Sequence, residues 1–229
     1  MKRLKALKIY LPLICIFVLF SLFTTGEAIA TTYYVSPTGN DANNGSKEAP
    51  LRTIQKAANI VNPGDTVLVA DGVYTDTDGD HYIVWMTRSG TSGAWITFKA
   101  QNTWGAVCDG QNDWSIIKNW AMYGAAYVRV EGFEMKGTGG CSMMSFTGSH
   151  DIYWYHNKVH DNGRRTFTCT DPNAAYGQGG GGGESAGVYN VTYDSNVLYN
   201  LGRLPNGCGD LDYRRDHGRD CHEPFDRRT

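Results

Sequence analysis

The stretch Tyr33–Tyr74, YYVSPTGNDANNGSKEAPLRTIQKAANIVNPGDTVLVADGVY, decides the fold of this chain. Apolar residues at helical spacing predict one amphipathic helix over residues 51–61. These residues are Leu51, Ile54, Ala57, Ala58 and Val61. A turn cluster at Asn62–Asp65 ends the helix, and Thr66–Ala70 has the β-branched pattern of a strand. Because only short strands follow this helix, we interpret it as a cap on a stacked β structure.

Short strands are predicted along the rest of the chain, separated by Gly, Asn and Asp. They lie at Tyr82–Met86, Trp95–Ala100, Ser115–Lys118, Tyr127–Val130, Asp151–Tyr155 and Val188–Tyr193. Three segments align with one another: VRVEGFEMKG from Val128, IYWYHNKVHDNGR from Ile152 and VTYDSNVLYNLGR from Val191. The first two are offset by 24 residues and the next by 39, which is one repeat plus an insertion. A period in the twenties predicts a solenoid.

A glycine-rich stretch over residues 166–183 accounts for the longer second offset. It reads TFTCTDPNAAYGQGGGGG and has no strand pattern. Insertions in repeat proteins map to loops on one face, which is often the binding face. We therefore expect this inserted loop either to line a cleft or to be a flexible excursion without a function.

Alternation within the strands predicts which side chains face the core. In Val128–Val130 and Val191–Tyr193, alternate residues are expected to point inward. Asn157 and Asn196 occupy equivalent turns, where stacked amides hydrogen-bond to each other and to the backbone. The histidines beside these turns are interpreted as packed turn residues: His150, His156 and His160. Four aromatic side chains are expected on the outside: Trp114, Trp120, Tyr153 and Tyr155.

The fixed points of the N-terminal stretch are its turn residues and its apolar helix positions. They are Gly39, Asn40, Asp41, Asn43, Gly45, Pro50, Leu51, Thr53, Ile54, Ala57, Pro63, Gly64, Asp65, Thr66, Gly72 and Tyr74. Through them the chain resembles the N-terminal part of secreted, pectate lyase-like polysaccharide lyases. The resemblance implies an all-β fold, a right-handed parallel β-helix with an N-terminal amphipathic capping helix, over residues 31–229.

Residues 1–30 have the pattern of a secretory signal peptide. The basic start consists of Lys2, Arg3, Lys5 and Lys8. An apolar run over residues 9–23 and an A-x-A cleavage site at Ala28–Ala30 follow. The run is short for a membrane-spanning helix, which needs about 20 residues. We therefore expect a secreted protein, extracellular or periplasmic, with no stable membrane association after cleavage.

Cleavage after Ala30 would leave 17 basic against 22 acidic residues. This mildly acidic balance gives no electrostatic case for nucleic acid. It is compatible with an acidic polysaccharide, since a local basic cleft suffices, and we expect a monomer. Five cysteines would remain, and their odd number leaves at least one unpaired. They are Cys108, Cys141, Cys169, Cys208 and Cys221.

The family resemblance implies β-elimination on a uronate-containing glycan. This reaction needs a base for the proton α to the carboxyl group and positive charge for the enolate-like intermediate. The resemblance implies Lys or Arg as the base. It also implies Ca²⁺ as the cofactor, held by carboxylates, and this ion prefers hard oxygen ligands.

Charged residues in the aligned repeats and in the following segment supply the candidates. The catalytic candidates are Lys158, Arg164, Arg214 and Arg215. The substrate-binding candidates are Arg165, Arg203 and Tyr155. The candidate calcium ligands are Asp210, Asp212 and Asp216. The alternative for each charged residue is a place in a solvated, charged turn.

Two other functions fit the sequence. A non-catalytic carbohydrate-binding or surface protein would explain the expected outer aromatics and the absence of a sharp catalytic motif. A glycoside hydrolase on the same fold would use paired carboxylates. The sequence has neither two adjacent aspartates nor a Gly-His-Gly, so this alternative ranks last.

The segment after His217 differs from what similar proteins carry. Asp216-His217-Gly218 leads into RDCHEPFDRRT, which has no strand pattern. Similar β-helix proteins continue from such a motif into another apolar strand. We therefore expect the chain to be incomplete at its C-terminus, with the last coil uncapped.

Overall fold

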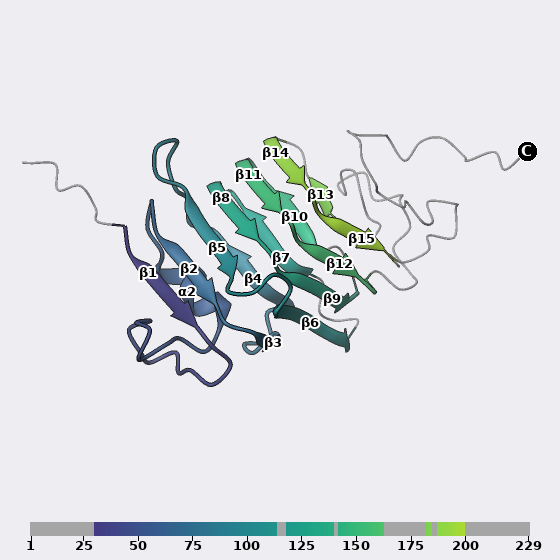
Figure 1. Cartoon of the computed structure of the whole chain (residues 1–229). Coiled ribbons are helices and arrows are strands. Elements are labelled where there is room, and N and C mark those ends of the chain that lie inside the picture. Colours follow the sequence, from purple (N-terminus) through teal and green to yellow (C-terminus); the bar gives the residue numbers. More distant parts are fainter. Residues whose placement is uncertain (1–29, 114–117, 140–141, 163–181, 185–186, 200–229) are drawn as a thin grey trace, which may run out of the picture.

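Three parallel sheets wind around one core in the computed structural model (Figure 1). The structure describes residues 30–113, 118–139, 142–162, 182–184 and 187–199. Every ladder between these strands is parallel, and each strand pairs with the strand one coil further on. This arrangement is a parallel β-helix, which confirms the predicted all-β solenoid.

The three sheets form the faces of the solenoid. Sheet A contains β1 (Thr32–Val35), β2 (Thr66–Val69), β5 (Ile96–Ala100), β8 (Ala126–Glu131), β11 (His150–Tyr155) and β14 (Tyr189–Asp194). Sheet B contains β3 (Gly72–Tyr74), β6 (Ala106–Asp113), β9 (Glu134–Thr138), β12 (Lys158–His160) and β15 (Val197–Tyr199). Sheet C contains β4 (Tyr82–Met86), β7 (Lys118–Tyr123), β10 (Met143–Phe146) and β13 (Gly182–Glu184).

The predicted repeat sets the register of the coils. Val128 pairs with Ile152, and Ile152 pairs with Val191, so both offsets read from the sequence are confirmed. Residues 163–181, which hold most of the expected inserted loop, lie outside the described residues. Gly182 and Gly183, at the end of that stretch, belong to β13.

Large side chains fill the interior of the solenoid. Val128 and Val130 are fully buried, as the alternation predicts. The expectation that Trp120 lies outside is wrong, because its ring is also fully buried. It contacts the rings of Phe98 and Phe133 at 5.1 and 5.2 Å. Its strand neighbours, Val84 and Met143, are buried as well, so this row of sheet C points inward.

An asparagine ladder holds the turn between sheets A and B. The buried Asn157 side chain accepts a hydrogen bond from the Phe133 amide at 3.0 Å and donates one to the Val130 carbonyl at 3.0 Å. The Asn157 amide in turn donates to the Asn196 side chain at 2.8 Å. The ladder confirms the prediction for this pair of asparagines. The preceding residue, His156, has a φ of 55°, so the turn uses a left-handed position.

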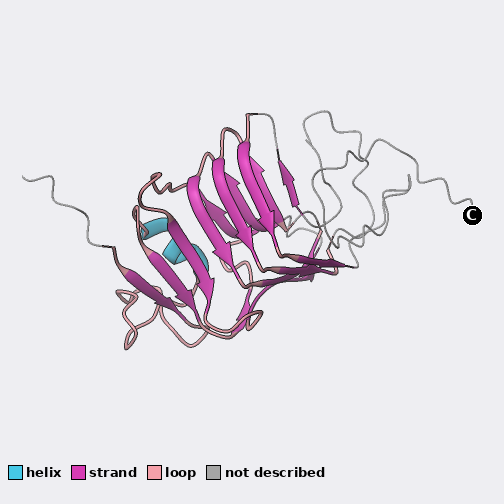
Figure 2. Ribbon diagram, turned by 45° about the horizontal axis from the view of Figure 1, so that its top comes forward, coloured by secondary structure: helices cyan, strands magenta, loops and turns pink. Residues whose placement is uncertain are grey.

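Helix α2 (Ile54–Ile60) lies at the N-terminal end of the strand stack (Figure 2). Its N-cap is Thr53, whose hydroxyl accepts from the Lys56 amide at 3.0 Å. The helix begins later than residue 51 because Leu51 bonds to β1, with its amide donating to the Tyr34 carbonyl at 2.9 Å. No helix in the described part of the chain is long and apolar enough to cross a membrane.

The side chain of Gln55 links α2 to the edge of sheet C. The Trp85 amide donates to the Gln55 side-chain oxygen at 2.6 Å, and the Gln55 amide group donates to the Trp85 carbonyl at 3.0 Å. Gln55 thus takes the place of a neighbouring strand for β4. This contact protects the edge of the sheet, which is what the sequence predicts for the cap.

Candidate functional site

Most of the predicted site residues lie outside the described residues. These are Arg164, Arg165, Arg203, Asp210, Asp212, Arg214, Arg215 and Asp216. Their assignment stays a prediction. Lys158 and Tyr155 are described, and they lie on different faces: Lys158 on sheet B and Tyr155 on sheet A, with the Asn157 turn between them.

Lys158 forms an ion pair on the outer face of sheet B. Its ammonium group lies 2.8 Å from Glu134, which also contacts His160 at 3.1 Å. The hydrogen bond to Glu134 raises the pKa of Lys158 above its ordinary value. A general base must be unprotonated to accept a proton, and this contact favours the charged form instead. The ion pair therefore weighs against Lys158 as the base.

Tyr155 lies on the outer face of sheet A beside Tyr153. Their rings are stacked with centroids 5.8 Å apart, and the Arg129 guanidinium lies 4.7 and 4.8 Å from the two rings. Arg129 also contacts Glu131 at 3.0 Å. Tyr155 is half-buried, and it packs against this arginine in the described structure.

Three aspartates come together in the loop between β3 and β4. Carboxylate oxygens of Asp76, Asp78 and Asp80 all lie within 4.8 Å of one another. We call this segment, Asp76–Asp80, the acidic loop. Its D-x-D-G-D spacing is visible in the sequence but lies outside the aligned repeats, so these aspartates are not among the predicted site residues. Gly79, with a φ of 79°, allows the left-handed turn that brings the carboxylates together.

The electrostatics of the acidic loop are compatible with a bound cation. Partial burial opposes ionisation of Asp76, but the backbone amides of Gly79, His81 and Asp78 donate to it and hold its pKa below the ordinary value. Burial and the charges of Asp78 and Asp76 raise the pKa of Asp80. A divalent cation would relieve this repulsion. Three carboxylates so close together fit the hard oxygen ligands that Ca²⁺ takes.

Aromatic rings cover the outer face of sheet C next to the acidic loop. The Tyr82 and Trp85 rings are 4.5 Å apart, and Trp85 stacks on Tyr123 at 4.9 Å. The Lys118 ammonium lies 4.7 Å from the Phe146 ring centroid and 5.6 Å from that of Tyr82. We call these five residues the sheet C face.

Tyr82 joins the sheet C face to the acidic loop. Its backbone amide donates to the Asp80 carboxylate at 2.9 Å, and burial together with the Asp80 charge raises the pKa of its hydroxyl. Lys118 approaches the same ring. Through Tyr82, the carboxylates of the acidic loop therefore adjoin the lysine and the aromatic rings of the sheet C face. Aromatic rings stack on the apolar C–H surfaces of sugars, and a lysine attracts an anionic group.

The fold defines a parallel β-helix protein. The family model described as "Pel9A-like, right handed beta helix region" matches residues 33–197. The chain therefore belongs to this family, and the match confirms the right-handed winding.

Curated relatives share part of the chain. It is 38% identical over 88 residues to pectate lyase L of Dickeya dadantii (strain 3937), which is 38% of this chain and 21% of that protein. It is 31% identical over 145 residues to pectate lyase L of Dickeya chrysanthemi, covering 59% and 34% of the two chains. The matched part thus spans about a fifth to a third of the length of these relatives.

A solved structure supports the fold alone. The lacto-N-biosidase of family GH136 from Eubacterium ramulus is similar with a TM-score of 0.54 at 18% identity. The similarity covers 74% of this chain and 34% of that one. At this identity the comparison shows a shared architecture and does not show a shared reaction.

Proposed function

We propose that this chain belongs to a Ca²⁺-dependent polysaccharide lyase that cleaves a uronate-containing glycan by β-elimination. The observation that carries the proposal is the contact through Tyr82 between the acidic loop and the sheet C face. The similarity to relatives named pectate lyase supports an acidic polysaccharide as the substrate.

The described residues have distinct roles in this proposal. Asp76, Asp78 and Asp80 would hold the calcium ion, which supplies positive charge to a uronate carboxylate and to the developing enolate. Lys118 attracts a second carboxylate of the glycan. Trp85 and its neighbouring rings stack on the sugar rings and fix their orientation.

The remaining roles stay with the residues that the sequence predicts. The base is proposed among Arg164, Arg214 and Arg215, with Lys158 the least suited of the predicted candidates because of its ion pair with Glu134. Further binding is proposed at Arg165, Arg203 and Tyr155, and a second calcium site at Asp210, Asp212 and Asp216. The signal-peptide pattern of residues 1–30 supports a proposal of secretion, and we keep the proposal of a monomer that binds no nucleic acid.

A panel of glycans tests the reaction. The full chain is incubated with pectate, alginate and glycosaminoglycans, with calcium or with a chelator, and ultraviolet absorbance records unsaturated products. Calcium-dependent absorbance on one of these glycans is the expected result. Reducing ends without that absorbance would indicate hydrolysis, and no product from any glycan would contradict the proposal.

A non-catalytic carbohydrate-binding function is the second candidate. It is favoured by the sheet C face, where Tyr123 is 43% exposed and stacks on Trp85. Binding of a glycan without any product would support it. A hydrolase ranks last, because the sequence has neither two adjacent aspartates nor a Gly-His-Gly.

A further inference from the structure

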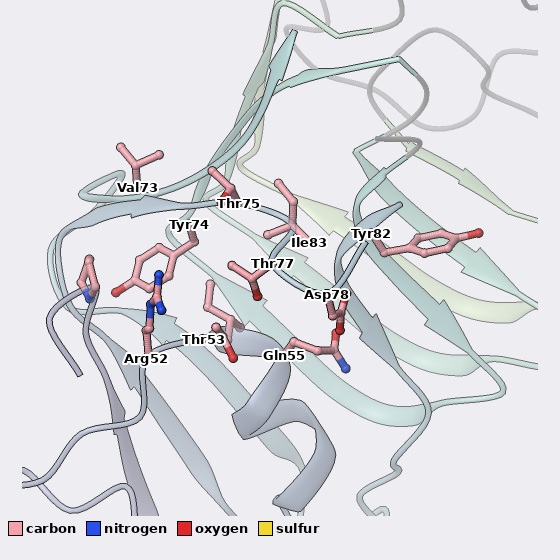
Figure 3. A pocket seen from close by; sticks show the side chains of 12 residues that line it. Arg52, Thr53, Gln55, Val73, Tyr74, Thr75, Thr77, Asp78, Tyr82 and Ile83 are labelled. Carbon is pink, nitrogen blue, oxygen red and sulfur yellow. The ribbon is translucent and has the colours of Figure 1, made fainter. Parts of the chain in front are cut away.

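A hollow of about 100 Å³ lies between the start of α2 and the β3–β4 loop (Figure 3). Its lining includes Arg52, Thr53, Tyr74, Thr77, Asp78 and Ile83. Figure 3 shows Arg52 and Asp78 on opposite sides of the hollow, with Thr77 between them. Tyr82 also belongs to the lining, and in the same view its ring points away from Arg52.

Two polar groups of the hollow are available to a ligand. Among the described residues, neither the Arg52 guanidinium nor the Thr77 hydroxyl has a hydrogen-bond or ion-pair partner, and Arg52 is bound only through its backbone amide, to Asp41. The hydroxyls of Thr53 and Tyr74, by contrast, are occupied. Thr53 donates to Asp41 at 2.8 Å, and Tyr74 donates to the Ala70 carbonyl at 2.9 Å.

We propose that this hollow binds a single hexuronate residue, at a site separate from the sheet C face. The Arg52 guanidinium matches a carboxylate, because its planar N–H groups donate two parallel hydrogen bonds. Across the hollow, the Asp78 carboxylate accepts hydrogen bonds from sugar hydroxyls, and the Thr77 hydroxyl donates or accepts. Ile83 offers an apolar contact to the sugar's C–H surface.

The charges of Arg52 and Asp78, on opposite sides of the hollow, would distinguish a uronate from other ligands. A neutral sugar lacks the carboxylate that Arg52 would bind. A simple carboxylate lacks the hydroxyls whose hydrogen bonds Asp78 would accept. The inference takes from the proposed function only the class of sugar. Asp78 also belongs to the acidic loop, so the test is made in the presence of a chelator, without calcium.

The test is a titration of the isotope-labelled full chain, followed by nuclear magnetic resonance. Sodium D-galacturonate is expected to shift the amide signals of Arg52 and of residues 75–78, and D-galactose to bind at least about tenfold more weakly. Arg52→Gln is expected to lower the galacturonate affinity about tenfold, the size of one charge-assisted hydrogen bond. Lys47→Gln, the same charge change at an exposed site, is expected to leave it unchanged.

A second variant and the lyase assay separate the outcomes. Thr77→Val is expected to weaken the binding of both galacturonate and galactose, because the Thr77 hydroxyl would bond to a sugar hydroxyl that both carry. Equal affinity for the two sugars, no binding, or an unchanged affinity in Arg52→Gln would overturn the proposal. Product formation by Arg52→Gln at the wild-type rate would leave the proposed lyase function intact, whereas galacturonate binding without product from any glycan would contradict only that function.

Discussion

Asn157 is fully buried and joins three successive coils. Its side-chain amide accepts from the Phe133 N–H and donates to the Val130 carbonyl, and its backbone N–H donates to the Asn196 side chain. Replacing Asn157 with alanine leaves a buried N–H and a buried carbonyl without partners. Such groups cost about 1–3 kcal/mol each. We expect Asn157→Ala to lower the free energy of unfolding by about 2–4 kcal/mol, measured by urea denaturation.

The control for this prediction is Asn44→Ala. Asn44 is exposed and accepts only a local hydrogen bond from Ser46 at 3.0 Å. Its loss is expected to cost about 0.5 kcal/mol or less, as at most surface positions. A similar loss of stability in the two variants would show that the ladder does not hold the turn.

Glu134 makes the stability of the folded protein depend on pH in the acid range. Burial opposes its ionisation, but hydrogen bonds from Lys158 and His160 outweigh burial and lower its pKa. A carboxylate with a lowered folded pKa contributes stability above its unfolded pKa and loses it as the pH falls through the folded pKa. We expect the advantage of wild type over Glu134→Gln to disappear between about pH 5 and pH 3.

Thermal unfolding of both proteins across this range measures the effect. Glu48→Gln is the matched control, because Glu48 is exposed and has no ion pair among the described residues. Parallel curves for wild type and Glu134→Gln would contradict the predicted linkage.

At the residue scale, the spacing of the repeats predicted side-chain contacts better than the chemical type of the residues did. The offset of 24 residues that aligns Val128 with Ile152 also aligns Glu134 with Lys158, so this ion pair was readable from the sequence. The Asn157 and Asn196 pair was read in this way. The inward direction of the Trp120 side chain was not predicted. Consecutive residues of β7 are buried, so the strand lacks the alternation of buried and exposed positions on which such a prediction depends.

At the scale of secondary-structure elements, the side chain of Gln55 joins helix α2 to strand β4. Gln55→Ala removes both hydrogen bonds to the Trp85 backbone. We expect a loss of about 1–3 kcal/mol in the free energy of unfolding, and faster hydrogen exchange of the Trp85 amide.

Asn59→Ala is the matched control for the cap. It removes only the contact between the Gln55 and Asn59 side chains, 2.8 Å apart, and leaves the bonds to Trp85. Trp85 exchange is expected to stay slow in this variant. Unchanged exchange in Gln55→Ala would mean that the helix does not protect the sheet edge.

The elements were predictable where the pattern is local. The helix follows from its apolar stripe, but its start shifted because Leu51 bonds to β1, a contact that links distant segments. The acidic loop was not predicted, because it lies outside the aligned repeats that supplied the charged candidates. Its contact with Lys118, through Tyr82, depends on the pairing of β4 with β7, which no local pattern gives.

At the scale of the whole molecule, each coil contacts its neighbours. Removing residues 134–157 deletes one repeat of 24 residues and joins Phe133 to Lys158 in register. Since solenoid stability is roughly a sum over repeats, we expect this shortened chain to fold, with lower stability. Removing residues 134–145, half a coil, shifts later strands onto the wrong sheets and is expected to abolish cooperative unfolding.

Circular dichroism during denaturation compares the two deletions. If both unfolded cooperatively, or if neither did, the coil would not be the repeating unit.

The solenoid itself could be predicted from the sequence, because its period recurs over long stretches. The arrangement of charges around its faces could not, since each face collects residues from several coils.

The central claim is that the acidic loop supports calcium-dependent β-elimination. It is tested most directly by ultraviolet absorbance from polygalacturonate treated with the full chain, in parallel with the double variant Asp76→Asn/Asp78→Asn and the control Glu48→Gln. The account predicts a calcium-dependent rise for wild type and control, and a rate at least about tenfold lower for the double variant, as expected when carboxylate ligands are lost. Equal rates in all three proteins, or no rise in wild type, would contradict it.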